Sequence, residues 1–285
     1  MQRTSLYTTF IQFVNTYSIW VALGSFTSYL FFSRIYDVEP NYLIATGLSL
    51  GVWFIYTLDH LLDGIKLKDK ASTLRHKEHF EKQGVIKWLL ITVAFTLIVI
   101  AFWVPVFYYR FIGMLISLTC IHFVINYWVS SKVKRLLFLK EVFIALIVTI
   151  GFSISPCLEI KSLVIISDFY PIFGLFFFIN LANLMLFSFF DKEADRSTGT
   201  LSIAGFYSDT SLRLFIGLSL AISAFLTSYL FFGDNMQFLV FILLTSMQVT
   251  LLVINVFPAF FKVKDHYRFW GDFIYVYPLF VLPFL

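Results

Sequence analysis

The sequence has little charge for its length. Only 13% of its 285 residues are Asp, Glu, Lys or Arg, while 59% are hydrophobic and the mean hydropathy is +0.85. A soluble domain carries about twice that share of charge, because its surface must face water. The composition therefore excludes a compact soluble enzyme and the disordered and fibrous classes, and it predicts that lipid surrounds much of the chain.

Several familiar signals are also missing. The chain has two cysteines, Cys120 and Cys157, both inside apolar runs, so neither a disulfide framework nor a zinc-binding spacing is present. The sequence contains no Gly-rich phosphate loop, and nothing in it points to haem or to a nucleic-acid partner. No small-residue cleavage site follows the first apolar run, which we therefore interpret as a retained span and not as a signal peptide.

Long apolar runs dominate what remains. A helix needs about 20 apolar residues to cross a bilayer, and strands of a membrane barrel would alternate in polarity, which these runs do not. The nine runs lie near 12–32, 42–62, 88–108, 111–129, 137–156, 169–190, 212–232, 236–258 and 268–285. We predict an all-α fold, a polytopic helical bundle with about nine transmembrane helices, forming a single membrane domain over 1–285.

The basic residues are divided unevenly between the links. If all nine runs cross the bilayer, 18 of the 21 Lys and Arg residues fall on the side of the N-terminus. Because basic residues gather in cytoplasmic links, we predict a multi-pass protein of the cell membrane whose N-terminus is cytoplasmic and whose C-terminus lies on the opposite side. The two long links, 63–87 and 190–211, are then cytoplasmic, and long links often carry function. The site is therefore expected at the cytoplasmic face.

Two pairs of aspartates mark the ends of the second and sixth runs. Asp59 and Asp63 occur in YTLDHLLDG, and Asp191 and Asp195 occur in FFDKEADRSTG. A spacing of four places both carboxylates of a pair on one helical face, where they repel each other. An even number of crossings brings both pairs to the same side of the membrane. Ordinary solvation explains one such pair, but two matched pairs favour a magnesium site, because Mg²⁺ prefers oxygen ligands.

Basic and polar side chains accompany these carboxylates, as expected for a polyphosphate ligand. Positive-inside topology and anionic lipid explain several of the basic residues equally well. Asn183, more than two turns before Asp191, either faces a cavity or forms a helix–helix hydrogen bond. A local ion pair between Arg268 and Asp272 accounts for the acid in the last run. The candidate binding residues are Arg75, His76, Lys132, Lys134, Asn183, Lys192 and Arg196.

These motifs, on a chain of nine apolar runs, resemble the UbiA superfamily of intramembrane prenyltransferases. The stretch DKEADRSTGTLSIA is similar to the family's Asp-x-x-x-Asp motif, and DHLLD is similar to the end of its first aspartate-rich motif. The stretch TLRHKEHF lies where the family has a basic cap over the site. The first motif departs from the family at Ile55 and Tyr56, where Asn and often Asp are usual. This departure bears on the number of bound Mg²⁺ ions and indicates a divergent branch.

The resemblance implies a Mg²⁺-dependent enzyme that moves an isoprenoid chain from a prenyl diphosphate to a small aromatic or lipid-like acceptor. Metal and basic residues would neutralise the leaving diphosphate, and the cap link 63–87 would close over the site and exclude water. The residues that would bind the metal and act in catalysis are Asp59, Asp63, Asp191 and Asp195.

Three other functions stay open. A transporter would place charged residues near the bilayer midplane on broken helices, whereas these acids cluster at one face and Gly or Pro breaks inside the runs are few. A UbiA-like scaffold that has lost its chemistry is compatible with Ile55 and Tyr56. A UbiA-like terpene cyclase would use the same kind of metal site.

Overall fold

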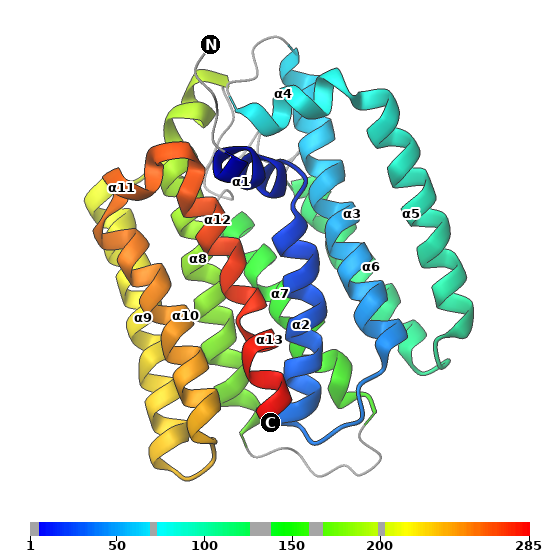
Figure 1. Cartoon of the computed structure of the whole chain (residues 1–285), viewed down its shortest axis with the longest axis vertical. Coiled ribbons are helices and arrows are strands. Elements are labelled where there is room, and N and C mark those ends of the chain that lie inside the picture. Colours follow the sequence, from blue (N-terminus) through cyan, green and yellow to red (C-terminus); the bar gives the residue numbers. More distant parts are fainter. Residues whose placement is uncertain (1–5, 69–72, 126–137, 160–167, 199–202) are drawn as a thin grey trace.

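The computed structural model describes residues 6–68, 73–125, 138–159, 168–198 and 203–285. Over these residues the chain consists of helices and short links and contains no strand, as the sequence predicted (Figure 1). The long helices are α2 (Ile19–Ile35), α3 (Tyr42–Leu67), α5 (Gln83–Trp103), α6 (Tyr108–Val124), α7 (Phe138–Cys157), α8 (Phe169–Thr198), α9 (Asp209–Phe232) and α10 (Phe238–Val256). The short elements are α1 (Leu6–Thr16), α4 (Leu74–Glu81), η4 (Ile203–Gly205), α11 (Pro258–Lys262), η5 (Val263–Asp265), α12 (His266–Phe273), η6 (Ile274–Val276), α13 (Pro278–Val281) and η7 (Leu282–Phe284).

Six helices of the described chain are long and apolar enough to cross a membrane, namely α3, α5, α7, α8, α9 and α10. Helices α2 and α6 are apolar but shorter, with 17 residues each. The two end runs differ from the expected continuous spans. The first run breaks at Ser18, which has a left-handed φ of 52°. The last run is a chain of short helices, in which Pro278 and Pro283 lack the backbone N–H that a continuous helix needs.

The largest apolar core forms around α8, which packs against α7, α9 and α10. Helix α5 is the contrasting case, because only Ile86 and Leu90 are buried along its whole length. Its outer side presents large apolar side chains such as Trp88 and Phe102, which are 72% and 79% exposed. A contiguous apolar surface of this kind fits a lipid environment, and the chain has the architecture of a polytopic membrane protein.

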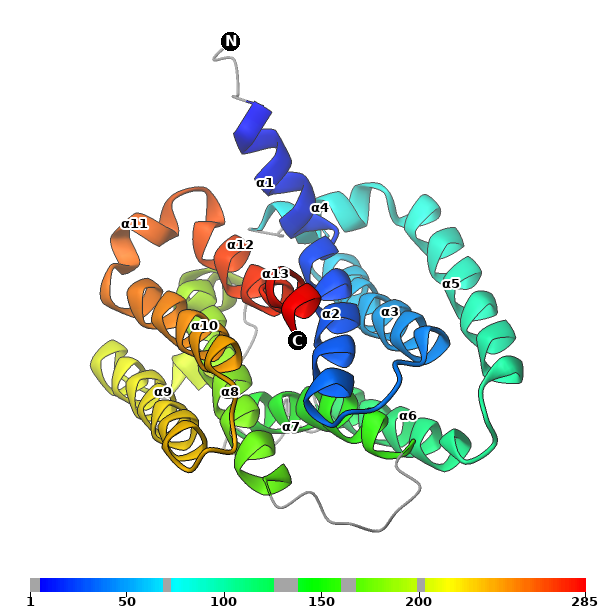
Figure 2. The same cartoon turned by 60° about the horizontal axis from the view of Figure 1, so that its bottom comes forward.

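Helices α1, α4 and α11 lie at one end of the bundle, and the C-terminal α13 reaches the other end (Figure 1). The membrane side that each terminus faces stays a prediction, as does the cytoplasmic identity of the α4 end. Viewed from the other end, α12 and α13 lie beside α2 and α10 (Figure 2). The broken ninth run therefore packs inside the bundle next to α8.

Both aspartate pairs lie inside helices and not at their ends. Helix α3 continues beyond Asp63 to Leu67, and α8 continues beyond Asp195 to Thr198. Helix α4 folds back onto α3 at Gly64, where an added Cβ would lie only 2.7 Å from the backbone oxygen of His76. This close approach brings the side chains of α4 over the tips of α3 and α8.

Candidate functional site

The carboxylate of Asp191 is the centre of a charged cluster at the α4 end of the bundle. Its Oδ2 atom accepts hydrogen bonds from Arg75 on α4 at 3.0 Å and from Arg268 on α12 at 2.6 Å. The hydroxyl of Tyr267 donates to its Oδ1 atom at 2.6 Å. The two arginine side chains are only 13% and 9% exposed. One carboxylate therefore joins three helices that lie far apart in sequence.

Aromatic side chains of α8 fix the groups that α12 contributes. The guanidinium of Arg268 lies 4.6 Å from the ring centre of Phe187, a cation–π distance. The ring of Tyr267 stacks on Phe190 at 4.2 Å with an interplanar angle of 11°. Phe187 lies one turn before Asp191 on α8 and Phe190 directly precedes it, so this helix holds both the carboxylate and the groups that bind it.

Helix α4 also reaches the first aspartate pair. The Nε2 atom of His76 lies 3.9 Å from Oδ2 of Asp63, and its ring lies 5.7 Å from the ring of His60. Burial lowers the pKa of His76 to about 3, and the neighbouring Arg75 charge acts in the same direction. His76 is therefore neutral at pH 7 and its contact with Asp63 is not an ion pair. Since Arg75 and His76 are adjacent, α4 connects the two aspartate motifs.

The structure does not gather the four aspartates into one cluster. Within the described chain, no group of three or more His, Cys, Asp or Glu side chains is placed to hold a metal ion. Asp59 lies one turn before Asp63 and acts electrostatically on Tyr56 and His122. Asp195 lies one turn after Asp191 and is partly buried. Asp63 and Asp191 are the two carboxylates that meet at α4.

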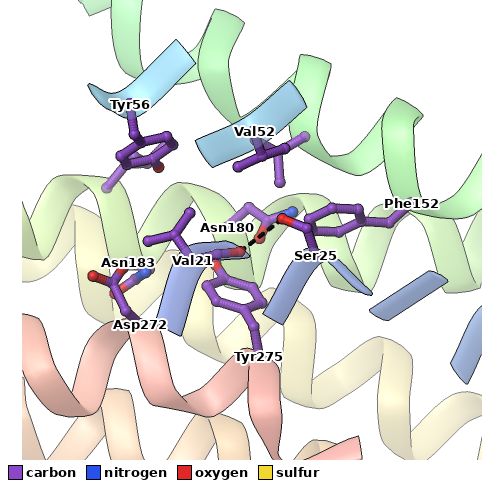
Figure 3. Close-up of a pocket in the computed structure, with 11 residues that line it drawn as sticks. Val21, Ser25, Val52, Tyr56, Phe152, Asn180, Asn183, Asp272 and Tyr275 are labelled. Carbon is purple, nitrogen blue, oxygen red and sulfur yellow. Dashed lines mark hydrogen bonds between the residues drawn. The ribbon is translucent and has the colours of Figure 1, made fainter. Parts of the chain in front are cut away.

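The other predicted binding residues are divided. Lys192 points away from the cluster, because its Nζ atom pairs with Asp209 at 2.5 Å and donates to the backbone oxygen of Tyr207 at 3.2 Å. Arg196 is exposed near the end of α8. Asn183 is buried, lines a cavity inside the bundle (Figure 3) and forms a side-chain hydrogen bond with Tyr275, so both of its interpretations stay open. Lys132 and Lys134 lie outside the described residues.

The sequence analysis did not name two residues of the cluster, Tyr267 and Arg268, as functional candidates. The local pairing expected between Arg268 and Asp272 is wrong, because Arg268 forms its salt bridge with Asp191, 77 positions away. The available signal was an arginine at the start of an apolar run, and the topology count and the nearby Asp272 already accounted for it. The contact between Arg268 and Asp191 could not be predicted, because the sequence did not indicate that the ninth run breaks and forms the short helix α12.

The cluster can bind an anion. In the described chain the buried Nε atoms of Arg75 and Arg268 have no hydrogen-bond partner, so each guanidinium keeps an unused donor. Guanidinium groups bind phosphate oxygens through paired hydrogen bonds. A diphosphate between these arginines would lie beside the carboxylates of Asp63 and Asp191.

Comparison with known proteins gives a likeness in fold. No family model and no curated protein sequence matches the chain. Among solved structures, the chain is similar to a UbiA homolog from Archaeoglobus fulgidus bound to GPP and Mg²⁺. The TM-score is 0.60 and the identity 13%, and the match covers 95% of this chain and 99% of the other. The chain therefore has the fold of a UbiA homolog over nearly its whole length, as its two aspartate motifs predicted.

Proposed function

We propose that the chain is an intramembrane prenyltransferase, which moves an isoprenoid group from a prenyl diphosphate to a small acceptor. The observation that carries this proposal is the Asp191 cluster, in which two buried arginines and a carboxylate meet at the end of a UbiA-like bundle. The similar UbiA homolog was solved with GPP and Mg²⁺, and we infer the same classes of ligand here.

The arginines supply the diphosphate site. Each presents an Nε donor that the described chain leaves unused, and both are mostly buried, where a charged hydrogen bond is stronger than in water. When the bond between the isoprenoid and the diphosphate breaks, negative charge grows on the diphosphate oxygens. Arg75 and Arg268 stabilise this charge from positions that are already fixed, which lowers the barrier.

The carboxylates suit Mg²⁺. This ion commonly takes only one or two protein carboxylates and completes its shell with water and substrate phosphate, so a cluster of three acids is not required. An ionised carboxylate offers about four lone-pair sites, and Asp191 uses three of them. Asp63 and Asp191, with Asp59 and Asp195 on the adjoining turns, would hold the ion. Bound there, Mg²⁺ adds positive charge beside the leaving diphosphate.

Helix α4 serves as the cap of the site in this proposal. It carries Arg75 to Asp191 and His76 to Asp63, so one short helix closes the space between the two motifs. Keeping water away matters because the allylic cation formed from the isoprenoid reacts with any nucleophile. We place this end of the bundle at the cytoplasmic face, since most basic residues gather there.

Ile55 and Tyr56 stand where the family has polar groups, and they favour one alternative, a UbiA-like scaffold without activity. A binding experiment separates the two. The purified protein in lipid nanodiscs is titrated with geranyl, farnesyl and geranylgeranyl diphosphate, with and without Mg²⁺. The enzyme is expected to bind at least one of them in a Mg²⁺-dependent manner, and diphosphate release is then followed with membrane extracts as the acceptor source.

Substitutions at the proposed site test whether the binding measured in this experiment takes place there. Arg268→Gln removes a charged donor and is expected to weaken diphosphate binding by about tenfold or more, and Asp63→Asn is expected to weaken its dependence on Mg²⁺. Asp234→Asn, at an exposed turn of the opposite end, is the control and should bind as the natural chain does. Absence of binding of all three diphosphates at high Mg²⁺ would reject the enzyme and support the scaffold.

A further inference from the structure

A pocket of about 150 Å³ lies near the α4 end of the bundle, where α8 and α10 end and α9 begins. Helices α9, α10 and α11 lie together at this side of the bundle (Figures 1 and 2). We call it the outer pocket, and its walls are the apolar residues Phe189, Phe190, Pro258 and Ala259 and the charged residues Lys192, Glu193, Asp209 and Lys262. A cavity of this size accepts a group about as large as benzene. The outer pocket therefore has room for a small polar group with an apolar side.

Two ion pairs line the outer pocket and join three helices. Lys192 on α8 pairs with Asp209 at the start of α9, with 2.5 Å between nitrogen and oxygen. Lys262 on α11 pairs with Glu193 on α8 at 2.7 Å. The side chains of Asp209, Glu193 and Lys262 are 65%, 78% and 57% exposed, and exposed pairs contribute little to stability. A ligand that carries both signs of charge can therefore replace these pairs at little cost.

The balance of charge in the outer pocket indicates the class of ligand. Its two lysines and two carboxylates cancel, whereas the basic pockets that bind anionic lipid headgroups carry an excess of Lys and Arg. A ligand with one phosphate and one ammonium group keeps the pocket neutral. The phosphate oxygens accept hydrogen bonds from lysine, and a primary ammonium group has three N–H donors for the carboxylates. A quaternary ammonium group has no N–H to donate, so it cannot form these bonds.

The outer pocket lies at the level expected for lipid headgroups. The candidate membrane spans of α8 and α10 end at Arg196 and Val256, and that of α9 begins at Asp209, so three spans reach the membrane boundary at the pocket. Tyr207, whose backbone oxygen accepts a hydrogen bond from Lys192, is 37% exposed, and tyrosines are enriched at this boundary. The outer faces of α9 and α10 expose apolar side chains against which acyl chains can pack, among them Leu214, Leu218 and Leu252.

One wall of the outer pocket is held in place by the Asp191 cluster. The ring of Phe190 stacks on the ring of Tyr267 at 4.2 Å, and the hydroxyl of Tyr267 donates to Asp191 at 2.6 Å. Because this wall is fixed before a ligand arrives, binding loses less conformational entropy. The outer pocket and the Asp191 cluster therefore share one aromatic side chain and use different polar groups of α8.

We propose that the outer pocket binds the headgroup of phosphatidylethanolamine. The lipid phosphate accepts hydrogen bonds from Lys192 and Lys262, and the ammonium group donates to Glu193 and Asp209. The methylene groups of the headgroup pack against Phe190, and the acyl chains lie along α9 and α10. This inference does not depend on the proposed prenyl transfer, because it uses none of the residues proposed to hold Mg²⁺ or diphosphate.

The first test compares three lipids with the same dioleoyl chains: phosphatidylethanolamine, phosphatidylcholine and phosphatidylglycerol. The natural protein in detergent micelles is titrated with each lipid, and bound lipid is counted by native mass spectrometry. Hydrogen bonds between the ammonium group and the carboxylates predict that the first phosphatidylethanolamine binds at least about tenfold more tightly than either other lipid. Equal affinities overturn the inference. A preference for phosphatidylglycerol, which marks an anionic-lipid site, or for phosphatidylcholine overturns it as well.

The second test uses substitutions in the outer pocket to locate the bound lipid. Lys262→Gln is expected to weaken phosphatidylethanolamine binding about tenfold, and the double variant Glu193→Gln/Asp209→Asn is expected to reduce its affinity to that of phosphatidylcholine. Lys77→Gln is the matched control, because it breaks a similarly exposed pair with Glu81 on α4, outside the pocket, and it should bind lipid as the natural chain does. The thermal midpoint of each variant without added lipid shows that it is folded. A full preference for phosphatidylethanolamine in both pocket variants overturns the inference.

Discussion

Replacing Asp191 by Asn is expected to destabilise the ligand-free protein. The natural carboxylate neutralises Arg75 at 3.0 Å and Arg268 at 2.6 Å, and all three side chains are less than 15% exposed. Breaking a buried ion pair by removing one partner costs about 3–5 kcal/mol, because the remaining charge stays buried without compensation. Asp191→Asn leaves two buried guanidinium groups without a compensating charge, so the upper part of this range applies.

The sign of this effect distinguishes two roles for Asp191. A carboxylate that only awaits a metal ion is repelled by neighbouring acids, and its removal would stabilise the empty protein. A carboxylate that anchors two arginines does the opposite. The midpoint of thermal unfolding of the detergent-solubilised protein, without Mg²⁺ or diphosphate, measures the difference. At about 2–4 °C per kcal/mol for a chain approaching this size, the midpoint should fall by roughly 10 °C.

Two further variants make the test specific. Asp209→Asn breaks the pair with Lys192 at a carboxylate that is 65% exposed, and exposed pairs contribute about 1 kcal/mol or less. The double variant Asp191→Asn/Arg268→Met removes one of the stranded charges and should recover part of the loss. An unchanged or higher midpoint for Asp191→Asn alone would refute the anchoring role.

Two other stability effects follow from packing and burial. Gly24→Ala should lower stability by about 1–3 kcal/mol, because its Cβ would lie 2.5 Å from that of Tyr275, whereas Gly113→Ala, with no atom within 4 Å of its Cβ, should be neutral or slightly stabilising in the same thermal assay. Equal midpoints for the two variants would contradict this packing argument. Burial lowers the pKa of His79, whose Nδ1 atom contacts the backbone oxygen of Arg75, so the native state binds fewer protons than the unfolded chain below about pH 6.5. Stability should therefore decrease as the pH falls through that value, and His79→Gln should reduce the decrease measured between pH 7.5 and pH 5.5.

The helical bundle could be predicted from the sequence because each membrane helix is marked by a long run of apolar residues. An apolar run of 20 residues has few alternatives to a membrane helix, and six of the expected runs form such helices in the described chain. The aspartate motifs were found for a related reason. A spacing of four on a helix fixes a common face whatever the rest of the fold does, so local geometry alone made Asp59, Asp63, Asp191 and Asp195 candidates.

The groups that complete the site depend on contacts that no local pattern encodes. Asp272 lies four residues after Arg268, and in the sequence this spacing predicts a local ion pair that needs no other partner. The actual partner, Asp191, becomes available because Gly271 lets α12 approach α8 closely, with its missing Cβ 2.6 Å from Oδ1 of Asn183 and 2.7 Å from the ring of Phe187. A glycine in an apolar run has many explanations, and only the packed bundle selects this one.

The same close approach brings polar side chains of α12 into the bundle. Helix α12 brings Arg268 to the carboxylate of α8 and turns Asp272 toward the cavity that Tyr56 also lines. A continuous span at this place would carry the same residues past α8 at a constant distance, whereas a short helix followed by η6 can tilt inward. The break in the ninth run therefore lets polar groups of the C-terminal part reach the interior of the bundle. A variant that straightens this run should lose the Asp191 cluster and move Asp272 away from the cavity.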